Sequence, residues 1–331
     1  MDLQQRTRRF GMAVILCAVC LRLFAAGVPE KVARWLVQPN IASFLIYLET
    51  GRDVRFSASE EVFSPFFRES PAPWTKVEEI PPLPSFSPED ASLVEVYNSS
   101  GKKYDLPSLL QQPLDWDLRQ ENPTVLILHT HTTESYTKNG EAYEESSSYR
   151  TLDEDYNMLS IGRKVAEILE SSGIRTMQDT TLHDYPSYNG SYVHARNTLS
   201  EILAENPSVK LVLDLHRDAA GSGSGQLRTK AEVDGKTCAQ MMLVMGTNYD
   251  HWEENLALGA KLHVTLQKQA PGIMRPLNLR GQRFNQDLSD GALLIEMGAA
   301  GNTHAEAMLA AEQLARAIIT LAEGADVGEG Q

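Results

Sequence analysis

A short apolar run that ends in side chains able to bind a metal is the most constraining feature of this sequence. Residues 125–128 have the length and composition of a buried β-strand, and His129, His131 and Glu134 follow it closely. Open α/β sheets carry their ligand sites at the carboxyl ends of such buried strands. The run therefore predicts an α/β fold with a polar site at one edge of its sheet.

The same pattern returns twice later in the chain. Residues 210–215 form an apolar run that leads into His216, and residues 292–295 lead into Glu296. Because the carboxyl ends of parallel strands meet at one edge of a sheet, we expect His131, His216 and Glu296 to lie together.

Helical segments separate these strands. Apolar residues at helical spacing predict helices over residues 155–170 and 250–266, and two more helices are expected over residues 192–205 and after residue 303. Thr303 and Glu306 form a capping box for the last of them, and residues 226–233 and 241–245 are expected to pair as a hairpin. This order predicts a three-layer α/β sandwich with a mostly parallel central sheet.

The strand-end residues indicate a metal site. His131 and Glu134 are spaced so that both can meet one metal ion across a turn, and His216 supplies a third ligand. Two histidines, one carboxylate and an open water position form a catalytic zinc shell. Glu296 is then expected to act as the general base that takes a proton from the attacking water and returns it to the leaving amine. The sequence thus predicts a zinc hydrolase.

Alternatives stay open for two of these roles and for the neighbouring histidine. The loop after the first strand offers other glutamate ligands, namely Glu141, Glu144, Glu145 and Glu154. His129 points the same way as His131 along an extended strand, and it is either a ligand itself or an outer partner that orients one. The structural alternative for Glu296 is a buried salt bridge to Arg280 or Arg283.

Three further polar residues are candidates for supporting roles. Arg217 and Asp218 follow His216 directly and are expected to fix it or to contact a substrate carboxylate. Asp287 lies upstream of the strand that carries Glu296 and is expected to line the groove.

The N-terminus predicts export with a membrane anchor. Arg6, Arg8 and Arg9 precede an apolar segment of signal-anchor length, so residues 1–27 are expected to be a cytoplasmic basic end and one membrane-spanning helix. A cleaved signal peptide is the alternative. The expected order after it is a juxtamembrane helix and linker rich in Pro, Ser and Glu (28–115), an extracytoplasmic hydrolase domain (116–323) and a flexible tail (324–331).

Composition argues against two functional classes. The 331 residues carry 30 basic and 44 acidic side chains, a formal charge of −14, whereas a nucleic-acid-binding protein would present a basic face. Cys17 and Cys20 lie in the N-terminal apolar stretch and Cys238 stands alone in the rest, so no disulfide framework is expected there. No paired histidine signature accompanies Cys238, which argues against cysteine catalysis.

Four long motifs closely resemble the stage II sporulation protein P (SpoIIP) family. They are His129-Thr-His-Thr-Thr-Glu-Ser-Tyr136, Asp184-Tyr-Pro-Ser-Tyr-Asn-Gly-Ser-Tyr192, Asp214-Leu-His-Arg-Asp218 and Asn285-Gln-Asp-Leu-Ser-Asp-Gly-Ala-Leu-Leu-Ile-Glu296. The similarity covers residues 116–322. It implies a fold like that of zinc-dependent N-acetylmuramoyl-L-alanine amidases and an action on peptidoglycan during engulfment of the forespore.

The resemblance also implies roles for individual residues. His131 and His216 match the family's two histidine ligands, and Glu296 matches its catalytic glutamate. Related muramoyl amidases carry the glutamate ligand near the start of the next helix, where this chain has Glu154. We keep Glu134 as the first candidate and Glu154 as the second.

Activity and partners follow from the same resemblance. Family members cut the lactyl–L-alanine amide and also peptide cross-links, and they work at the sporulation septum with the glycan-cleaving SpoIID and the membrane protein SpoIIM. The two rivals to an amidase are an endopeptidase that uses the same zinc and an inactive scaffold that binds the wall. The complete set of two histidines and two glutamates argues against the scaffold.

Overall fold

The computed structural model describes residues 86–114, 117–137, 149–219, 221–222 and 225–325. The expected anchor, the juxtamembrane helix, most of the linker and the end of the tail lie outside these residues. Among the helices that the structure describes, none has the length and apolar character needed to cross a membrane.

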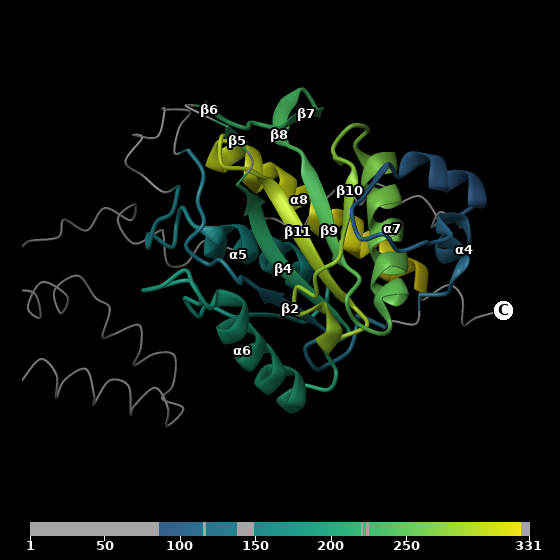
Figure 1. The fold of residues 1–331 in the computed structure, drawn as a ribbon, viewed down its shortest axis with the longest axis horizontal. Helices are drawn as coiled ribbons and strands as arrows, with labels where there is room; N and C mark the ends of the chain where they lie inside the picture. The colour runs from purple at the N-terminus through teal and green to yellow at the C-terminus, as the bar shows by residue number, and fades with distance from the viewer. Residues whose placement is uncertain (1–85, 115–116, 138–148, 220, 223–224, 326–331) are drawn as a thin grey trace, which may run out of the picture. The chain divides into compact units, whose positions relative to one another are not determined.

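A seven-stranded sheet forms the centre of the compact unit that begins at Ile80. Its order is β1 (Val96–Asn98), β10 (Leu277–Arg280), β9 (Met241–Gly246), β11 (Ala292–Ala299), β4 (Leu211–Asp218), β2 (Val125–Leu128) and β3 (Thr176–Gln178) (Figure 1). Strands β9 and β11 pair in antiparallel fashion, and the other neighbours in this sheet pair in parallel. The mostly parallel α/β sheet expected from the sequence is thereby confirmed.

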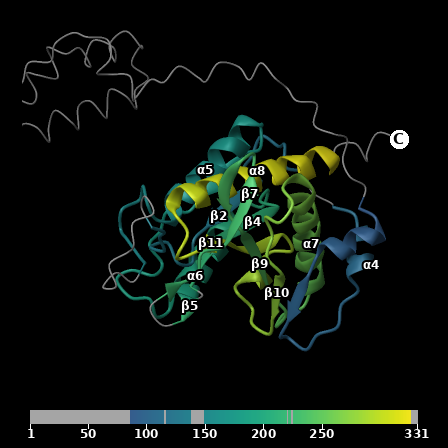
Figure 2. The same cartoon turned by 90° about the horizontal axis from the view of Figure 1, so that it is seen from above.

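Helices cover both faces of this sheet (Figure 2). One face packs against α5 (Met158–Ser171), α7 (Trp252–Gln269) and α8 (His304–Ala325) through alternate strand residues such as Ile127, Leu213 and Ile295. The other face packs against α6 (Ser191–Glu205) through Leu126 and Val212. All four residues of β2 are buried, as a central parallel strand requires.

Local chemistry fixes where the helices begin and end. The Asn157 side chain accepts a hydrogen bond from the Leu159 amide at 2.9 Å, so α5 begins at Met158, three residues later than the expected start at Asp155. Gly173 follows the end of that helix with a φ of 86°, a conformation that costs glycine little. Thr303 and Glu306 exchange hydrogen bonds at the start of α8, which confirms the expected capping box.

The hairpin differs from the expectation. The strands β7 (Lys230–Val233) and β8 (Lys236–Ala239) pair with each other across Asp234 and Gly235. Residues 241–246 instead form β9, which lies between β10 and β11 in the central sheet. The physical reason is burial, because every residue of β9 is buried and a hairpin arm would expose one face.

The folded unit also begins earlier than the expected boundary at residue 116. Strand β1 pairs with β10, while the helical turn η1 (Pro88–Leu93) and α4 (Leu106–Gln111) pack against α7. Leu106, Leu109 and Leu110 are buried there, and the Lys261 ammonium of α7 donates a 2.8 Å hydrogen bond to the Leu109 carbonyl. Residues 88–111 are therefore part of the domain and not linker.

This boundary predicts the behaviour of truncated chains. A fragment of residues 116–331 loses the burial of Val94 and of three leucines, and each such side chain stabilises by about 1.5–3 kcal/mol. The sum is comparable to the whole stability of an ordinary domain, about 5–15 kcal/mol. We expect this fragment to unfold or aggregate and a fragment of residues 80–331 to melt cooperatively in circular dichroism. Equal stability of the two fragments would contradict the boundary.

Candidate active site

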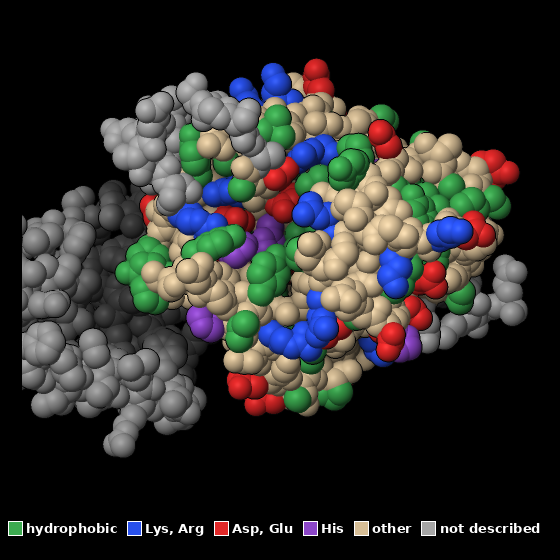
Figure 3. Space-filling model, viewed as in Figure 1, with side chains coloured by type: hydrophobic (Ala, Val, Ile, Leu, Met, Phe, Trp, Pro, Cys, Tyr) green, Lys and Arg blue, Asp and Glu red, His purple; other side chains and the backbone are tan. Residues whose placement is uncertain are grey.

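The carboxyl ends of β2, β4 and β11 meet at one edge of the sheet, as expected. In the register of β4 and β11, His216 is the direct partner of Glu296. The His131 ring, three residues beyond β2, lies with its centroid 5.2 Å from that of His216. Figure 3 shows histidine side chains at the surface beside acidic and basic ones. The structure therefore brings together two histidines and a glutamate from three strand ends.

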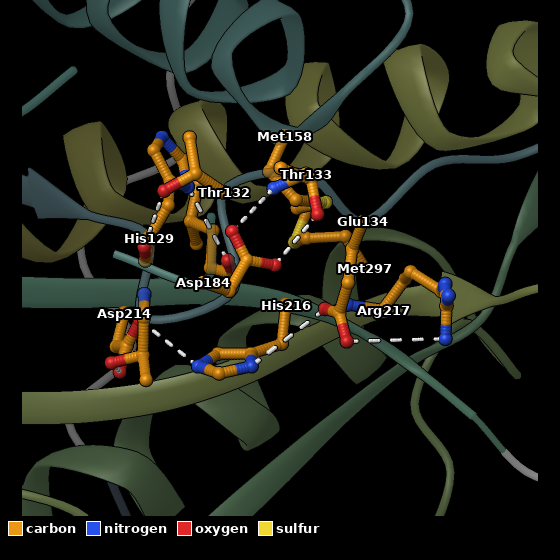
Figure 4. A network of polar contacts seen from close by, with 12 residues as sticks. His129, Thr132, Thr133, Glu134, Met158, Asp184, Asp214, His216, Arg217 and Met297 are labelled. Atoms are coloured by element: carbon orange, nitrogen blue, oxygen red, sulfur yellow. Dashed lines mark hydrogen bonds and ion pairs between the residues drawn. The ribbon is translucent and has the colours of Figure 1, made fainter. Parts of the chain in front are cut away.

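Glu134 lies beside this group and is almost fully buried. One carboxylate oxygen, Oε2, is 3.8 Å from His216 Nδ1 and accepts a 3.1 Å hydrogen bond from the Arg217 amide. The other oxygen accepts from the Arg150 guanidinium at 3.3 Å. The Arg217 guanidinium also lies 3.9 Å from Glu134 (Figure 4). Arg150 and Arg217 thus compensate the charge of Glu134 and fix its position next to His216.

A second buried carboxylate, Asp214, lies on the opposite side of His216. Its Oδ1 is 2.9 Å from His216 Nε2, and its two oxygens accept hydrogen bonds from the amide and hydroxyl of Thr130. Although burial alone would lower the pKa of His216, Asp214 and then Glu134 raise it to about 9. Asp214 therefore orients the ring so that Nδ1 faces Glu134.

Glu296 is the unpaired acid of the site. Its Oε2 is buried, and it has no hydrogen-bond partner in the part of the chain that the structure describes. Burial raises the pKa of Glu296 to about 8, and the nearby charge of Glu134 adds to this effect, while His216 opposes it. No ion pair joins it to Arg280 or Arg283 among the described residues, so the salt-bridge alternative is not found. A carboxyl group with a pKa near neutrality can take up and release a proton.

Two tyrosines surround His131. The ring of Tyr188 stacks on it with centroids 4.6 Å apart, and 55% of Tyr188 is exposed to solvent. The ring of Tyr192 meets His131 edge-on at 5.6 Å and lies nearly parallel to His216 at 6.4 Å. Burial lowers the pKa of His131, and the positive charges of His216 and Arg150 lower it further, to about 3.

An ion-pair cluster fastens the tyrosine segment to the site. Asp184 accepts hydrogen bonds from the amide and hydroxyl of Thr133 at 3.1 and 2.7 Å, and it also pairs with Arg150. The Arg150 guanidinium lies 4.7 Å from the ring centroid of Tyr188. Arg150 thus links Glu134, Asp184 and Tyr188.

His129 does not belong to this group. It is fully buried, with Nδ1 3.3 Å from the Leu215 carbonyl and Nε2 3.0 Å from the Gln178 amide. Burial lowers its pKa to about 4. Both ring nitrogens have neighbours in the core, so His129 joins β2 to β3 and β4 from within the fold.

The remaining side chains predicted for the site make contacts of other kinds. Arg217 donates to the Ser135 and Tyr149 carbonyls, and its backbone amide holds Glu134. Asp218 pairs with Arg275 at 2.8 Å. Asp287 makes two 2.8 Å contacts with Arg196 of α6. The side chain of Glu154 is 66% exposed and 4.0 Å from Arg163, and the alternatives at 141–145 lie outside the described residues.

The donor chemistry of the site suits zinc. His131 Nδ1 is buried without a hydrogen bond, His216 Nδ1 faces the Glu134 carboxylate, and the set is two imidazoles and one carboxylate. Asp214 behind His216 is the kind of outer carboxylate that orients a histidine ligand. Across the described ranges, no three His, Cys, Asp or Glu side chains already form a cluster able to hold a metal ion. Loading would therefore require Glu134 and the two rings to adjust.

Comparison with known proteins identifies the family. The family model "Stage II sporulation protein P (SpoIIP)" matches residues 76–319. This chain belongs to the SpoIIP family. The match confirms the resemblance found in the four motifs, and it includes the segment that carries β1 and α4.

One relative and two solved structures are similar to this SpoIIP-family chain. It is 28% identical over 255 residues to "Stage II sporulation protein P" of Bacillus subtilis (strain 168), an alignment covering 70% of this chain and 61% of that one. It thus spans about three fifths of the relative's length. A similar solved structure is the N-acetylmuramoyl-L-alanine amidase AmiC2 of Nostoc punctiforme, with 16% identity, a TM-score of 0.37 and coverage of 59% of this chain and 94% of that one. Another is the N-acetylmuramoyl-L-alanine amidase of Clostridium difficile 630, with 19% identity, a TM-score of 0.37 and coverage of 61% of this chain and 95% of that one.

Sequence reasoning missed four side chains of this SpoIIP-family site: Arg150, Asp184, Asp214 and Tyr192. Asp214 had a local signal, because a residue two positions before His216 on a strand shares its face. Asp184 and Tyr192 stand at the two ends of a motif that resembles the family, but the motif gave neither of them a role. Arg150, Asp184 and Tyr192 come from loops and a helix start, where spacing along the chain does not reveal neighbours across the fold.

The position of His129 predicts a packing defect. A Cβ atom added at Gly162 of α5 would lie closest to Gln178 Nε2, the partner of His129, and 2.6 Å from His129 Nε2, and both are too close for any real contact. We expect Gly162→Ala to lower the free energy of unfolding by about 1–3 kcal/mol, as overpacked cores do. The matched control is Gly259→Ala in α7, where the nearest atom is 3.4 Å away and no loss is expected. Equal urea midpoints for both variants would contradict the buried role of His129.

The raised pKa of Glu296 predicts a pH-dependent stability. A folded-state pKa of about 8, above its ordinary 4.5, means that the native state binds this proton more tightly than the unfolded state. The free energy of unfolding of the metal-free protein should therefore fall as pH rises from 4.5 to about 8. Each unit of the pKa shift is worth about 1.4 kcal/mol. Glu296→Gln should be more stable than the parent at pH 8 by a few kcal/mol.

Denaturant titrations from pH 4.5 to 8 would measure how the free energy of unfolding of the parent and of Glu296→Gln depends on pH. The control is Glu154→Gln, whose exposed side chain should leave the pH dependence of the parent unchanged. A parent slope that persists in Glu296→Gln would contradict this assignment.

Proposed function

We propose that this SpoIIP-family protein is a zinc-dependent peptidoglycan hydrolase that cleaves the amide between N-acetylmuramic acid and L-alanine. The observation that carries the proposal is the meeting of His131, Glu134 and His216 with the unpaired carboxyl of Glu296 at one sheet edge. Membership of the family supports the substrate class.

Three side chains would hold the metal. His131, Glu134 and His216 supply the two histidines and one carboxylate of a catalytic zinc shell. Zinc, when bound, polarises the carbonyl of the scissile amide and lowers the pKa of water. Glu134 is favoured over Glu154 because it lies 3.8 Å from His216, whereas Glu154 is exposed beside Arg163.

Glu296 moves the proton in this proposal. Its carboxylate accepts a proton from the attacking water and then donates it to the nitrogen of the departing L-alanine, so the stem peptide leaves as a neutral amine. Its pKa of about 8 keeps both protonation states within reach near neutral pH. Asp214 holds the His216 ring, and Arg150 and Arg217 hold Glu134.

The setting of the reaction is part of the same proposal. Residues 1–27 would anchor the chain in the cell membrane with its domain outside the cytoplasm, at the sporulation septum. SpoIID-like and SpoIIM-like proteins would be its partners during engulfment. Cleavage of peptide cross-links is the second activity to be tested, because the same residues could hydrolyse either amide.

Products and metal content test the proposal on the full-length chain. We expect about one zinc per chain by elemental analysis and chelator-sensitive release of free stem peptides from purified peptidoglycan by mass spectrometry. Glu296→Gln should retain zinc and lose cleavage by about 10²–10⁴-fold, because it cannot accept the proton. His131→Ala should lose the zinc as well.

Each contrary outcome has a separate meaning. Zinc with cleavage of cross-links alone would replace the amidase by an endopeptidase. Full activity of Glu296→Gln would refute its role as base. A zinc-free chain that binds peptidoglycan without releasing any product would favour the scaffold.

A further inference from the structure

Hydrolysis of an amide places negative charge on the carbonyl oxygen as water adds to the carbonyl carbon. Enzymes stabilise this charge with hydrogen-bond donors already aimed at the oxygen. Among the described residues around His131 and His216, the acids are acceptors and both arginines are engaged by Glu134 and by backbone carbonyls. Zinc would polarise this oxygen in the proposed reaction, and one further hydrogen-bond donor would add to the stabilisation.

Tyr192 is placed to supply it. Its ring centroid lies 5.6 Å from that of His131 and 6.4 Å from that of His216, while the two histidines are 5.2 Å apart. The three rings thus form a compact triangle. Tyr192 is half-buried, and no described residue makes a hydrogen bond to its hydroxyl. The hydroxyl can therefore donate a hydrogen bond to a bound substrate.

The tyrosine is also rigidly held. Its backbone carbonyl accepts a 2.8 Å hydrogen bond from the Asn285 side chain, in the segment that leads into β11. One turn later in α6, Arg196 makes two 2.8 Å contacts with Asp287 of the same segment. These contacts tie the start of α6 to the segment that ends in Glu296. A donor fixed in this way needs no reorganisation during the reaction.

The hydroxyl keeps its proton at neutral pH, because the phenol of tyrosine has an ordinary pKa of about 10. A phenol that retains its proton can donate a hydrogen bond to a negative oxygen but cannot act as a base at neutral pH.

We infer that Tyr192 is a further catalytic residue, whose hydroxyl donates a hydrogen bond to the carbonyl oxygen of the scissile amide as charge develops on it. The inference rests on the proposed amide hydrolysis. Tyr192 transfers no proton: the water proton goes to Glu296 and from there to the leaving nitrogen.

The test removes the hydroxyl and keeps the ring. In the full-length, zinc-loaded chain, Tyr192→Phe should lower kcat by about 10²-fold on a soluble disaccharide–peptide fragment of peptidoglycan, as loss of one such donor does. KM should stay within about twofold of the parent value, because the contact strengthens only in the transition state. Zinc content, melting temperature and the pH at which kcat is half-maximal should not change.

A matched control is Tyr97→Phe, which removes the hydroxyl of a 64% exposed tyrosine on the edge strand β1. Its kinetics should equal those of the parent. A parent that cleaves the fragment while Tyr192→Phe keeps its kcat would overturn the inference and leave the proposed function intact. A loss of zinc or of thermal stability in parallel with kcat would also overturn it, since Tyr192 would then be structural. A parent that cleaves neither amide would refute the proposed function itself.

Discussion

The site depends on the parallel alignment of β2, β4 and β11, which ends three buried strands at one edge of the sheet. Strand register leaves little freedom there, since a slip by one residue would turn each side chain to the opposite face. It places His216 beside Glu296, and the turn after β2 brings His131 to the same point. Residues that are 85 and 165 positions from His131 become neighbours because backbone hydrogen bonds hold the strands together.

The same alignment buries charge, which the surrounding residues must compensate. Glu134 and Asp214 are both almost fully buried, and an isolated carboxylate in such a place would cost several kcal/mol. Arg150 and Arg217 neutralise Glu134, and Thr130 and His216 satisfy Asp214. Glu296 alone lacks such partners among the described residues. The uncompensated group is therefore the one that the proposed reaction uses to carry a proton.

The strands, helices and site residues that show a strong local sequence pattern could be predicted from the sequence. The strands β2, β4 and β11 were predictable because each is an apolar run that leads into a polar residue. Helix α5 was predictable from its helical spacing, and α8 from the capping box at its start. The short elements β1, β10 and α4 were missed, since three to six residues carry too little periodicity to be recognised. The three strand-borne site residues were found together, whereas Arg150 and Asp184 were not, because their contacts join loops whose paths only tertiary packing determines.

The residues of the site are held in place in two ways, by strand pairing and by side-chain ion pairs. His216 and Glu296 lie on strands held by the backbone ladder of the central sheet, but Tyr188 and Tyr192 lie at the start of α6, which is fastened by side chains. The fastenings are the pair of Arg150 with Asp184 on one side and the pair of Arg196 with Asp287 on the other. The pair of Arg196 with Asp287 is partly exposed and contributes little to global stability, whereas the carboxylate of Asp184 is buried. Both pairs position the tyrosine segment, because they set how closely the tyrosines approach the two histidines. The sheet thus fixes His216 and Glu296, while side-chain contacts fix the tyrosine segment beside them.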